Sequence, residues 1–265
     1  MFLKKIRVVI LILLIVSFSG CKKNNIRDLK DIIERGKITV VTNAVFPPFE
    51  YYKFNNIEGI DIDIAREVAK DIGVELEILE MNFDGVIAAI ASGKGDFVAA
   101  GLTRDPKKEK AISFSDDYIL VPQSLILINN KINNKINNEI DALKDKKIGV
   151  QIGTTSDKYI RDNIKNGFLK NSLSELVEKK EYLDLVIDLR NNRLDVIALD
   201  GFIAREIVKR NKDLIYFDRD SENYALAVKK GNDDLLKKIN QTIKRLLDQD
   251  KIKEFYKKHY DYKFK

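Results

Sequence analysis

The sequence predicts an α/β protein of two lobes, and two observations carry this prediction. Short apolar segments alternate with segments of helical periodicity, a pattern typical of parallel sheets covered by helices. The alternation occurs twice, before and after residues 129–138, where Asn, Lys and Ile repeat in a segment that we interpret as a low-complexity surface loop. Two α/β series, each with loops at the carboxyl edge of its strands, imply two lobes with a cleft between them.

The first series is expected to contain three strands. A short helix ends at Arg35, and a helix that begins near Ile60 ends at Gly73, since glycine is favoured where a helix stops. The strands are Ile38–Val41, Glu75–Leu79 and Phe97–Ala100, with a helix at Gly85–Ser92.

The second series follows the low-complexity segment. Its expected strands are Lys147–Gln151, Val196–Leu199, Leu214–Phe217 and Tyr224–Val228. Its expected helices run from Gly153 to about Ile164 and over Tyr182–Leu189, Phe202–Asn211, Asp233–Leu247 and Ile252–His259.

The N-terminus has the pattern of a secretory signal. Basic residues precede the apolar run Val8–Phe18, which is about half as long as a membrane-spanning helix and gives way to Ser19-Gly20-Cys21. Cys21 is the only cysteine, which excludes a disulfide framework, and its position resembles a bacterial lipobox. We expect residues 1–20 to be a signal peptide and 21–36 a lipidated tether, with the protein anchored to the membrane and facing the periplasm or the cell exterior. An uncleaved anchor with a buried thiol is the alternative.

Composition and motifs argue against several classes of protein. The net charge of +6 includes three basic residues of the signal segment, and the other Lys residues are interspersed with Asp and Glu, which does not indicate nucleic-acid binding. The only histidine, His259, argues against a histidine-dependent triad or a His-rich metal site. Phosphate-loop, nucleophile-elbow and dinucleotide motifs do not occur in the sequence. We therefore expect no enzyme activity, no catalytic residues, no metal and no cofactor.

Loops after the strands of the first series carry candidate binding groups. Phe46 and Phe83 could sandwich a ligand side chain and would favour a cation, although core aromatic residues would have the same pattern. Thr103 offers a hydroxyl and an N–H group suited to a carboxylate. Lys107 and Lys108 could add positive charge, but a lysine pair is more often solvated surface.

The second series offers complementary groups. The segment Gly153–Ser156 opens a helix, whose first N–H groups attract an anion, although a simple helix cap is the alternative. Asp200 ends an apolar strand, where a carboxylate needs a partner such as a ligand ammonium, unless it only forms a turn before Gly201. Anion-binding and cation-binding groups together match an amino-acid zwitterion.

The chain from Lys37 to Tyr260 resembles the extracellular solute-binding proteins that supply amino-acid ABC transporters. The segments that carry the resemblance are Thr42–Glu50, Gly59–Asp63, Asn82–Gly85, Ala100–Thr103, Ser113–Tyr118, Gly149–Thr155 and Leu199–Asp200. The resemblance implies a type II periplasmic-binding-protein-like fold with two crossover strands as a hinge, near Tyr118–Pro122 and Asp220–Tyr224. The implied first lobe comprises residues 37–119 and 223–265, and the second comprises residues 120–222.

The resemblance also implies nine ligand-binding residues: Asn43, Phe46, Phe83, Gly101, Thr103, Lys108, Gln151, Thr155 and Asp200. Thr103 and the Thr155 backbone would hold the ligand carboxylate, and Asp200 would hold the ammonium. The two phenylalanines would flank the ligand, and the two amides would contact its side chain.

The chain departs from the family at one position. Lys108 stands where the family usually has an arginine that holds the carboxylate through two parallel hydrogen bonds, and lysine lacks that planar fork. Three explanations are open: Lys108 holds the carboxylate itself, Arg104 holds it instead, or the ligand is not a standard α-amino acid. We favour Lys108.

We therefore expect a monomeric, lipid-anchored protein that captures an amino acid and delivers it to the membrane permease of an ABC importer. Because Asn43 and Gln151 are neutral, they favour a neutral polar ligand such as glutamine, although the phenylalanines also suit a cation. The alternative is a periplasmic dehydratase that resembles the cyclohexadienyl dehydratases on the same fold. Its acid or base would be Glu50 or Lys108.

Overall fold

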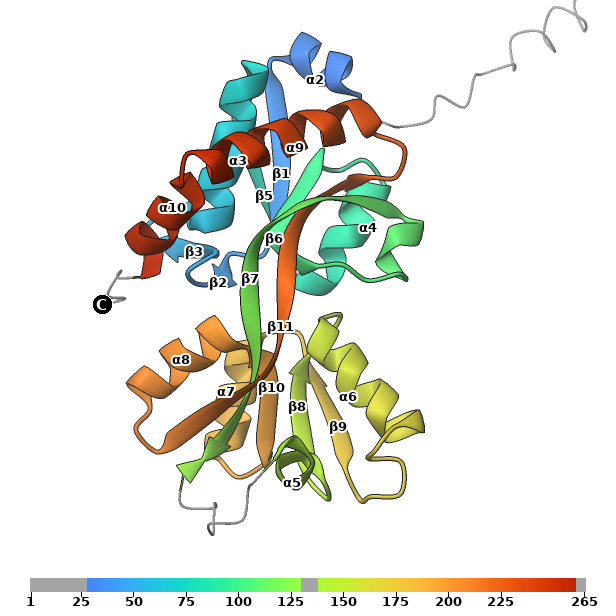
Figure 1. Ribbon diagram of the computed structural model, residues 1–265, viewed down its shortest axis with the longest axis vertical. Helices are drawn as coiled ribbons and strands as arrows, with labels where there is room; N and C mark the ends of the chain where they lie inside the picture. The colour runs from blue at the N-terminus through green and yellow to red at the C-terminus, as the bar shows by residue number, and fades with distance from the viewer. Residues whose placement is uncertain (1–27, 130–137, 261–265) are drawn as a thin grey trace, which may run out of the picture.

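The computed structural model describes residues 28–129 and 138–260, which form two α/β lobes on a shared sheet (Figure 1). The predicted signal peptide, Cys21 and most of the Asn-rich segment lie outside these residues. Within the two described ranges, no helix is long and apolar enough to cross a membrane.

The main sheet has eight strands in the order β5-β1-β6-β11-β7-β10-β8-β9. The first lobe contains the parallel strands β1 (Lys37–Thr42), β5 (Glu75–Glu80) and β6 (Phe97–Thr103). The second contains β8 (Lys147–Gln151), β9 (Glu175–Lys179) and β10 (Val196–Asp200), also parallel. The long antiparallel strands β7 (Ile112–Ile128) and β11 (Leu214–Lys229) pass through both lobes (Figure 1). A small sheet of β2 (Val45–Phe46), β3 (Glu50–Lys53) and β4 (Asn56–Glu58) follows β1.

Helices cover the sheet in both lobes (Figure 1). The first lobe has α2 (Leu29–Arg35), α3 (Ile60–Ile72), α4 (Val86–Ala91), α9 (Asp233–Asp248) and α10 (Lys251–Tyr260). The second has α5 (Glu139–Leu143), α6 (Thr155–Asn166), α7 (Tyr182–Arg190) and α8 (Gly201–Arg210). The apolar stripe of α3, with Ile60, Ile64 and Val68, is fully buried in one core with Ile239 and Ile243 of α9. The C-terminal helices thus complete the first lobe.

Two strands extend further than the sequence predicted. The predicted strand ended at Ala100, with the next three residues in a loop, but β6 continues to Thr103 because Tyr224 of β11 pairs with Thr103. Likewise, the two strands expected between Leu214 and Val228 are one, because the polar residues between them pair with β7, with Ser221 opposite Pro122. The two predicted crossovers therefore pair with each other.

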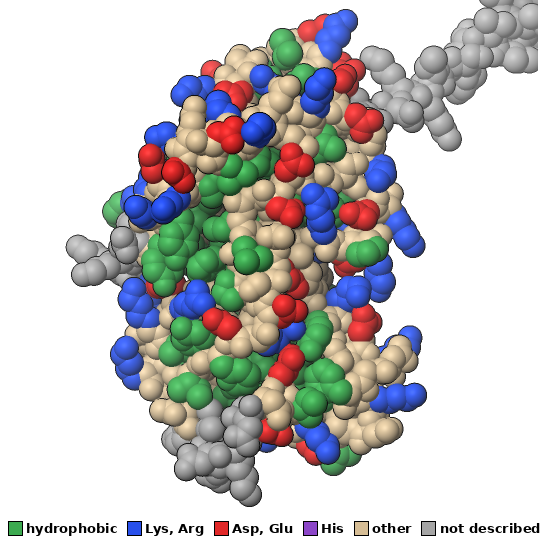
Figure 2. All heavy atoms as spheres, in the orientation of Figure 1, with side chains coloured by type: hydrophobic (Ala, Val, Ile, Leu, Met, Phe, Trp, Pro, Cys, Tyr) green, Lys and Arg blue, Asp and Glu red, His purple; other side chains and the backbone are tan. Residues whose placement is uncertain are grey.

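The short strands β2, β3, β4 and β9 were not predicted from the sequence. Strand β9 lies at the edge of the main sheet, and charged residues at both of its ends interrupt the apolar pattern. On the face shown in Figure 2, basic and acidic side chains are interspersed, as they are along the sequence.

The only histidine has a structural role in holding α10. His259 is 2% exposed, and its Nε2 lies 2.8 Å from Oδ2 of Asp63 in α3. Its Nδ1 lies 3.0 Å from the Tyr51 hydroxyl, and Lys258 also pairs with Asp63. Burial tends to raise the pKa of Asp63, but the hydrogen bonds from His259 and Lys258 outweigh burial and lower the pKa to about 2. This network fixes the last helix to the first lobe.

Replacing Ile239 by Ala should lower the free energy of unfolding by about 2–5 kcal/mol, because the change leaves a cavity in the core between α9 and α3. Leu247→Ala on the same helix is the control, since Leu247 is 44% exposed and its truncation should cost about 0.5 kcal/mol. Urea unfolding followed by circular dichroism measures both. Equal losses would contradict the packing of α9 described here.

Candidate functional site

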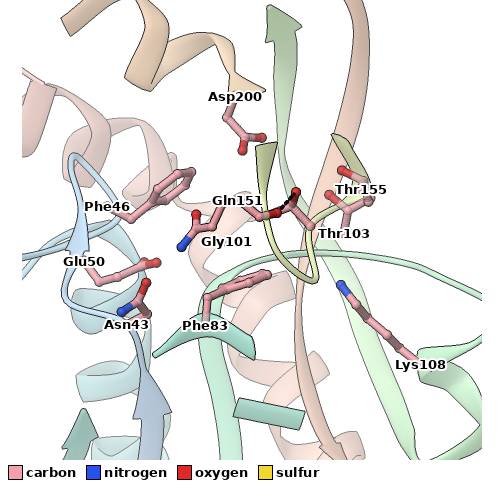
Figure 3. Close-up of a pocket in the computed structure, with 11 residues that line it drawn as sticks. Asn43, Phe46, Glu50, Phe83, Gly101, Thr103, Lys108, Gln151, Thr155 and Asp200 are labelled. Atoms are coloured by element: carbon pink, nitrogen blue, oxygen red, sulfur yellow. Dashed lines mark hydrogen bonds between the residues drawn. The ribbon is translucent and has the colours of Figure 1, made fainter. Parts of the chain in front are cut away.

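One pocket between the lobes gathers all nine residues that the sequence analysis selected (Figure 3). The first lobe contributes Asn43, Phe46, Glu50, Phe83, Gly101, Thr103 and Lys108, and the second contributes Gln151, Thr154, Thr155 and Asp200. Glu50 and Thr154 are the two lining residues that the prediction of the site did not include.

Aromatic side chains form the apolar walls of the pocket. Phe46 of β2 stacks on Phe49 with ring centroids 5.9 Å apart and meets the edge of Tyr182 of α7 at 6.3 Å. Phe46 therefore packs against both lobes. Phe83 begins a short 3-10 helix, η1 (Phe83–Gly85), and the Nζ atom of Lys108 lies 5.6 Å from its ring centroid.

The backbone at Gly101 allows these walls to approach each other. Gly101 has a φ of 56°, and a Cβ atom there would lie 3.1 Å from the rings of Phe46 and Tyr224. Both the conformation and the close approach favour glycine at this position. The Gly101 N–H donates to Asp61 at 2.9 Å, and the Tyr118 hydroxyl donates to the same carboxylate. This buried acid thus fixes the β6 backbone where it lines the pocket.

Lys108 is the basic residue that lines the pocket. It begins the short 3-10 helix η2 (Lys108–Lys110), and burial lowers its pKa, although acidic neighbours such as Asp105 and Glu222 oppose that effect. Arg104, the other candidate for a carboxylate clamp, is turned toward β7. Its Nε donates to Asp117 at 3.2 Å, and its Nη2 donates to the Ser115 carbonyl.

The N-terminus of α6 faces the same end of the pocket as Lys108 (Figure 3). Thr154 caps this helix, since its hydroxyl accepts from the Asp157 N–H at 3.1 Å. Thr155 donates its hydroxyl to Glu222 of β11 at 2.6 Å. The first N–H groups of the helix, Lys108 and Thr103 together make this end attractive to a carboxylate.

Asp200 supplies a carboxylate from the second lobe. It ends β10 and precedes α8, and Gln123 Nε2 and the Tyr224 hydroxyl each donate to its Oδ1 at 2.5 Å. Burial, followed by the charge of Glu222, raises the pKa of Asp200 to about 6, although the two hydrogen bonds act in the opposite direction. Its side chain points toward the pocket in Figure 3.

Glu50 is the acidic residue that the site prediction left out. It begins β3, is 1% exposed, and its Oε2 has no hydrogen-bond partner among the described residues. Burial chiefly, with the charges of Asp61 and Asp200, raises the pKa of Glu50 well above its ordinary value. In Figure 3 Glu50 and Asn43 lie on the side of the pocket opposite Lys108. The available sequence signal was its place at the end of the segment Thr42–Glu50, which carries the resemblance.

Two amide side chains also line the pocket: Gln151 lies near its middle, and Asn43 lies beside Glu50 (Figure 3). Gln151 donates its side-chain N–H to the Lys180 carbonyl at 2.9 Å, which fixes the amide. Asn43 is 3% exposed, and its Nδ2 finds no acceptor in the described part of the chain. No group of His, Cys, Asp and Glu residues that could hold a metal ion occurs within residues 28–129 and 138–260.

Comparisons with known proteins agree with the two-lobed α/β fold. A family model for bacterial extracellular solute-binding proteins, family 3, matches residues 38–262. The arginine-binding extracellular protein ArtP of Bacillus subtilis is 29% identical over 230 residues, which cover 84% of this chain and 85% of ArtP.

Two solved structures are also similar. The arginine-bound form of truncated ArgBP from T. maritima has a TM-score of 0.73 and 34% identity, and the match covers 82% of this chain and 99% of that one. The ancestral amino-acid-binding protein AncCDT-1, a precursor of cyclohexadienyl dehydratase, has a TM-score of 0.78 and 28% identity, with 88% and 99% covered. These matches confirm the predicted two-lobed α/β fold, and the chain belongs to the bacterial extracellular solute-binding proteins of family 3.

Proposed function

We propose that this protein binds an amino acid in the cleft and delivers it to the permease of an ABC importer. The observation that carries the proposal is one pocket that offers anion-binding groups of both lobes at one end and the carboxylate of Asp200 beside them. Asp200 would hold the ligand ammonium. Lys108, Thr103 and the Thr155 backbone would hold the α-carboxylate, with Lys108 as a point charge instead of the usual arginine fork.

We further propose a basic amino acid, represented by arginine, as the ligand. Glu50 and Asp200 line the pocket and the buried Asp61 binds the backbone of the lining residue Gly101, whereas Lys108 is the one basic residue among the lining residues. A zwitterion adds no net charge, but a cationic side chain beside Glu50 would offset part of this excess. ArtP and ArgBP, which are named for arginine, support the same choice.

The sequence-based preference for a neutral polar ligand rested on Asn43 and Gln151 and did not count Glu50. Glutamine stays the alternative, because a protonated Glu50 could donate a hydrogen bond to a neutral amide. Arginine requires an ionised Glu50, whereas glutamine can pair with either protonation state.

A comparison of arginine with citrulline, its neutral isostere, tests the ligand class. Isothermal titration calorimetry should show that the wild type prefers arginine, and that Glu50→Gln weakens arginine binding at least about 30-fold because it removes a buried charge partner. Citrulline binding should change less than threefold. Tighter binding of glutamine or citrulline than of arginine by the wild type would favour the neutral ligand and leave the transport proposal in place.

Replacing Asp200 by Ala should cost on the order of 3 kcal/mol or more of binding free energy, a loss of about 150-fold, because the ligand ammonium would lack its partner in the closed cleft. The matched control is Asp213→Ala, since Asp213 pairs with Arg190 on the surface of the second lobe. Calorimetry with arginine measures both variants. Near-normal affinity of the Asp200→Ala protein would remove Asp200 from the site.

A dehydratase is the second candidate function, and the buried Glu50 carboxyl with its raised pKa is the observation that favours it. The likeness to AncCDT-1, a precursor of such an enzyme, adds to its interest. Turnover of prephenate or arogenate by the purified protein, lost in Glu50→Gln, would establish this function in place of transport.

We also propose that the protein is a monomeric, membrane-anchored lipoprotein of the cell envelope that faces the periplasm or the cell exterior, with Cys21 as the lipidated residue. Cells grown with a palmitate analogue should label the wild-type protein, whereas Cys21→Ala should be unlabelled and either released or unprocessed. Labelling is read by in-gel fluorescence. Equal labelling of the two proteins would refute the assignment of Cys21.

A further inference from the structure

We propose that Tyr224 is a positioning residue for the binding site: from the crossover strand β11, it holds the Asp200 carboxylate ready for a ligand ammonium. The inference rests on the proposed function, since it concerns the group that would bind the ammonium. It adds a residue that does not line the pocket and acts through one that does.

Tyr224 stands where β11 leaves the sheet of the first lobe. It pairs with Thr103 of β6 on one side and with Ile119 of β7 on the other. Its hydroxyl reaches Oδ1 of Asp200 at 2.5 Å, and Asp200 belongs to β10 in the second lobe. One hydrogen bond therefore joins the crossover to the strand that carries the acid.

The tyrosine ring has little freedom to move. It is 1% exposed and packs edge-on against Phe49, with centroids 5.0 Å apart. It also lies close to Gly101 and 6.5 Å from the ring of Tyr118. Because these contacts are made by the ring, Tyr224→Phe keeps them and removes the hydroxyl alone.

A second donor acts on the same oxygen of Asp200. Gln123 of β7 donates its Nε2 to Oδ1, and its Oε1 accepts from Ser156 of α6 at 2.9 Å. Both crossover strands thus supply a donor to Oδ1. Two fixed donors on one oxygen orient the carboxylate plane, and we assign the other oxygen, Oδ2, to the ligand ammonium.

The hydroxyl also affects the charge of Asp200. Burial and the charge of Glu222 disfavour the carboxylate, while Glu50 and Lys108 face it from the first lobe. The hydrogen bond from Tyr224 lowers the pKa of Asp200 and so offsets part of the rise caused by burial, and the resulting pKa is about 6. Loss of the hydroxyl should raise this pKa. Since the ammonium requires an ionised partner, affinity should then begin to fall at a higher pH.

Calorimetry with L-citrulline, whose neutral side chain does not require an ionised Glu50, tests the inference from pH 5 to pH 9. Wild-type affinity should fall below about pH 6. In Tyr224→Phe this acidic limb should move up by half a pH unit or more, so that the loss relative to wild type is largest near pH 6 and smallest at pH 9. Tyr216→Phe is the control, since Tyr216 lies on the same strand but outside the cleft and is 37% exposed. A Tyr224→Phe limb that coincides with the wild type, or a loss that is equal at every pH, would overturn the inference.

A second measurement does not depend on ligand. Carbon-13 NMR of Asp-labelled protein, with Asp200→Asn used to assign the resonance, gives the titration midpoint of Asp200 in the free protein. The midpoint should rise in Tyr224→Phe and stay unchanged in Tyr216→Phe. An unchanged midpoint in Tyr224→Phe overturns the positioning role, whereas a wild type that binds no amino acid overturns the proposed function instead.

Discussion

The antiparallel pairing of β7 with β11 is the interaction on which the rest of the structure depends. The parallel strands of the first lobe join the sheet through β11, and those of the second join it through β7. Because Ser221 pairs opposite Pro122 and Asn223 opposite Leu120, the polar crossover has ladder partners and remains a strand. The same pair carries Tyr118, Gln123 and Tyr224, whose side chains bind the carboxylates beside the pocket. The connection between the lobes is thus also the support of the site.

The second constraint is the burial of negative charge. Asp61 and Asp200 each accept hydrogen bonds from a tyrosine of a crossover strand, so their cost of burial is partly offset within the protein. Glu50 has no such donor for its Oε2 among the described residues. A carboxyl group left in this state either stays protonated or meets a cation. The protonation state of Glu50 therefore links the ligand class to one residue. For this reason the proposed ligand class rests on Glu50 and not on the neutral amides.

The sequence predicted the α/β series and the α-helices other than α5, because apolar periodicity is a local signal, and the full set of predicted residues around the pocket came from the resemblance to the family. It missed the extension of β6 to Thr103 and the continuity of β11, since both result from pairing between residues far apart in the chain. It also missed the part played by Glu50. A glutamate at the start of a strand is an ordinary surface residue by pattern, whereas Glu50 is 1% exposed in the folded protein. The sequence likewise does not show which of Arg104 and Lys108 faces the pocket, because this depends on the hydrogen bond from Arg104 to Asp117 of β7.

Several contacts between protein groups already join the lobes in this structure. Phe46 meets Tyr182, Phe49 meets Phe202 at 5.8 Å, and Tyr224 bonds to Asp200. Of these, the contact between Phe49 and Phe202 lies outside the residues that line the pocket, so it favours this arrangement of the lobes whichever ligand is bound and scales the apparent affinity for every ligand alike. Glu50 and Asn43 contact one side of the pocket and differ in what they accept from one ligand to another. Affinity and selectivity are therefore assigned to different residues: substitutions at the contact of Phe49 with Phe202 should weaken all ligands equally, and substitutions at Glu50 should change their ranking.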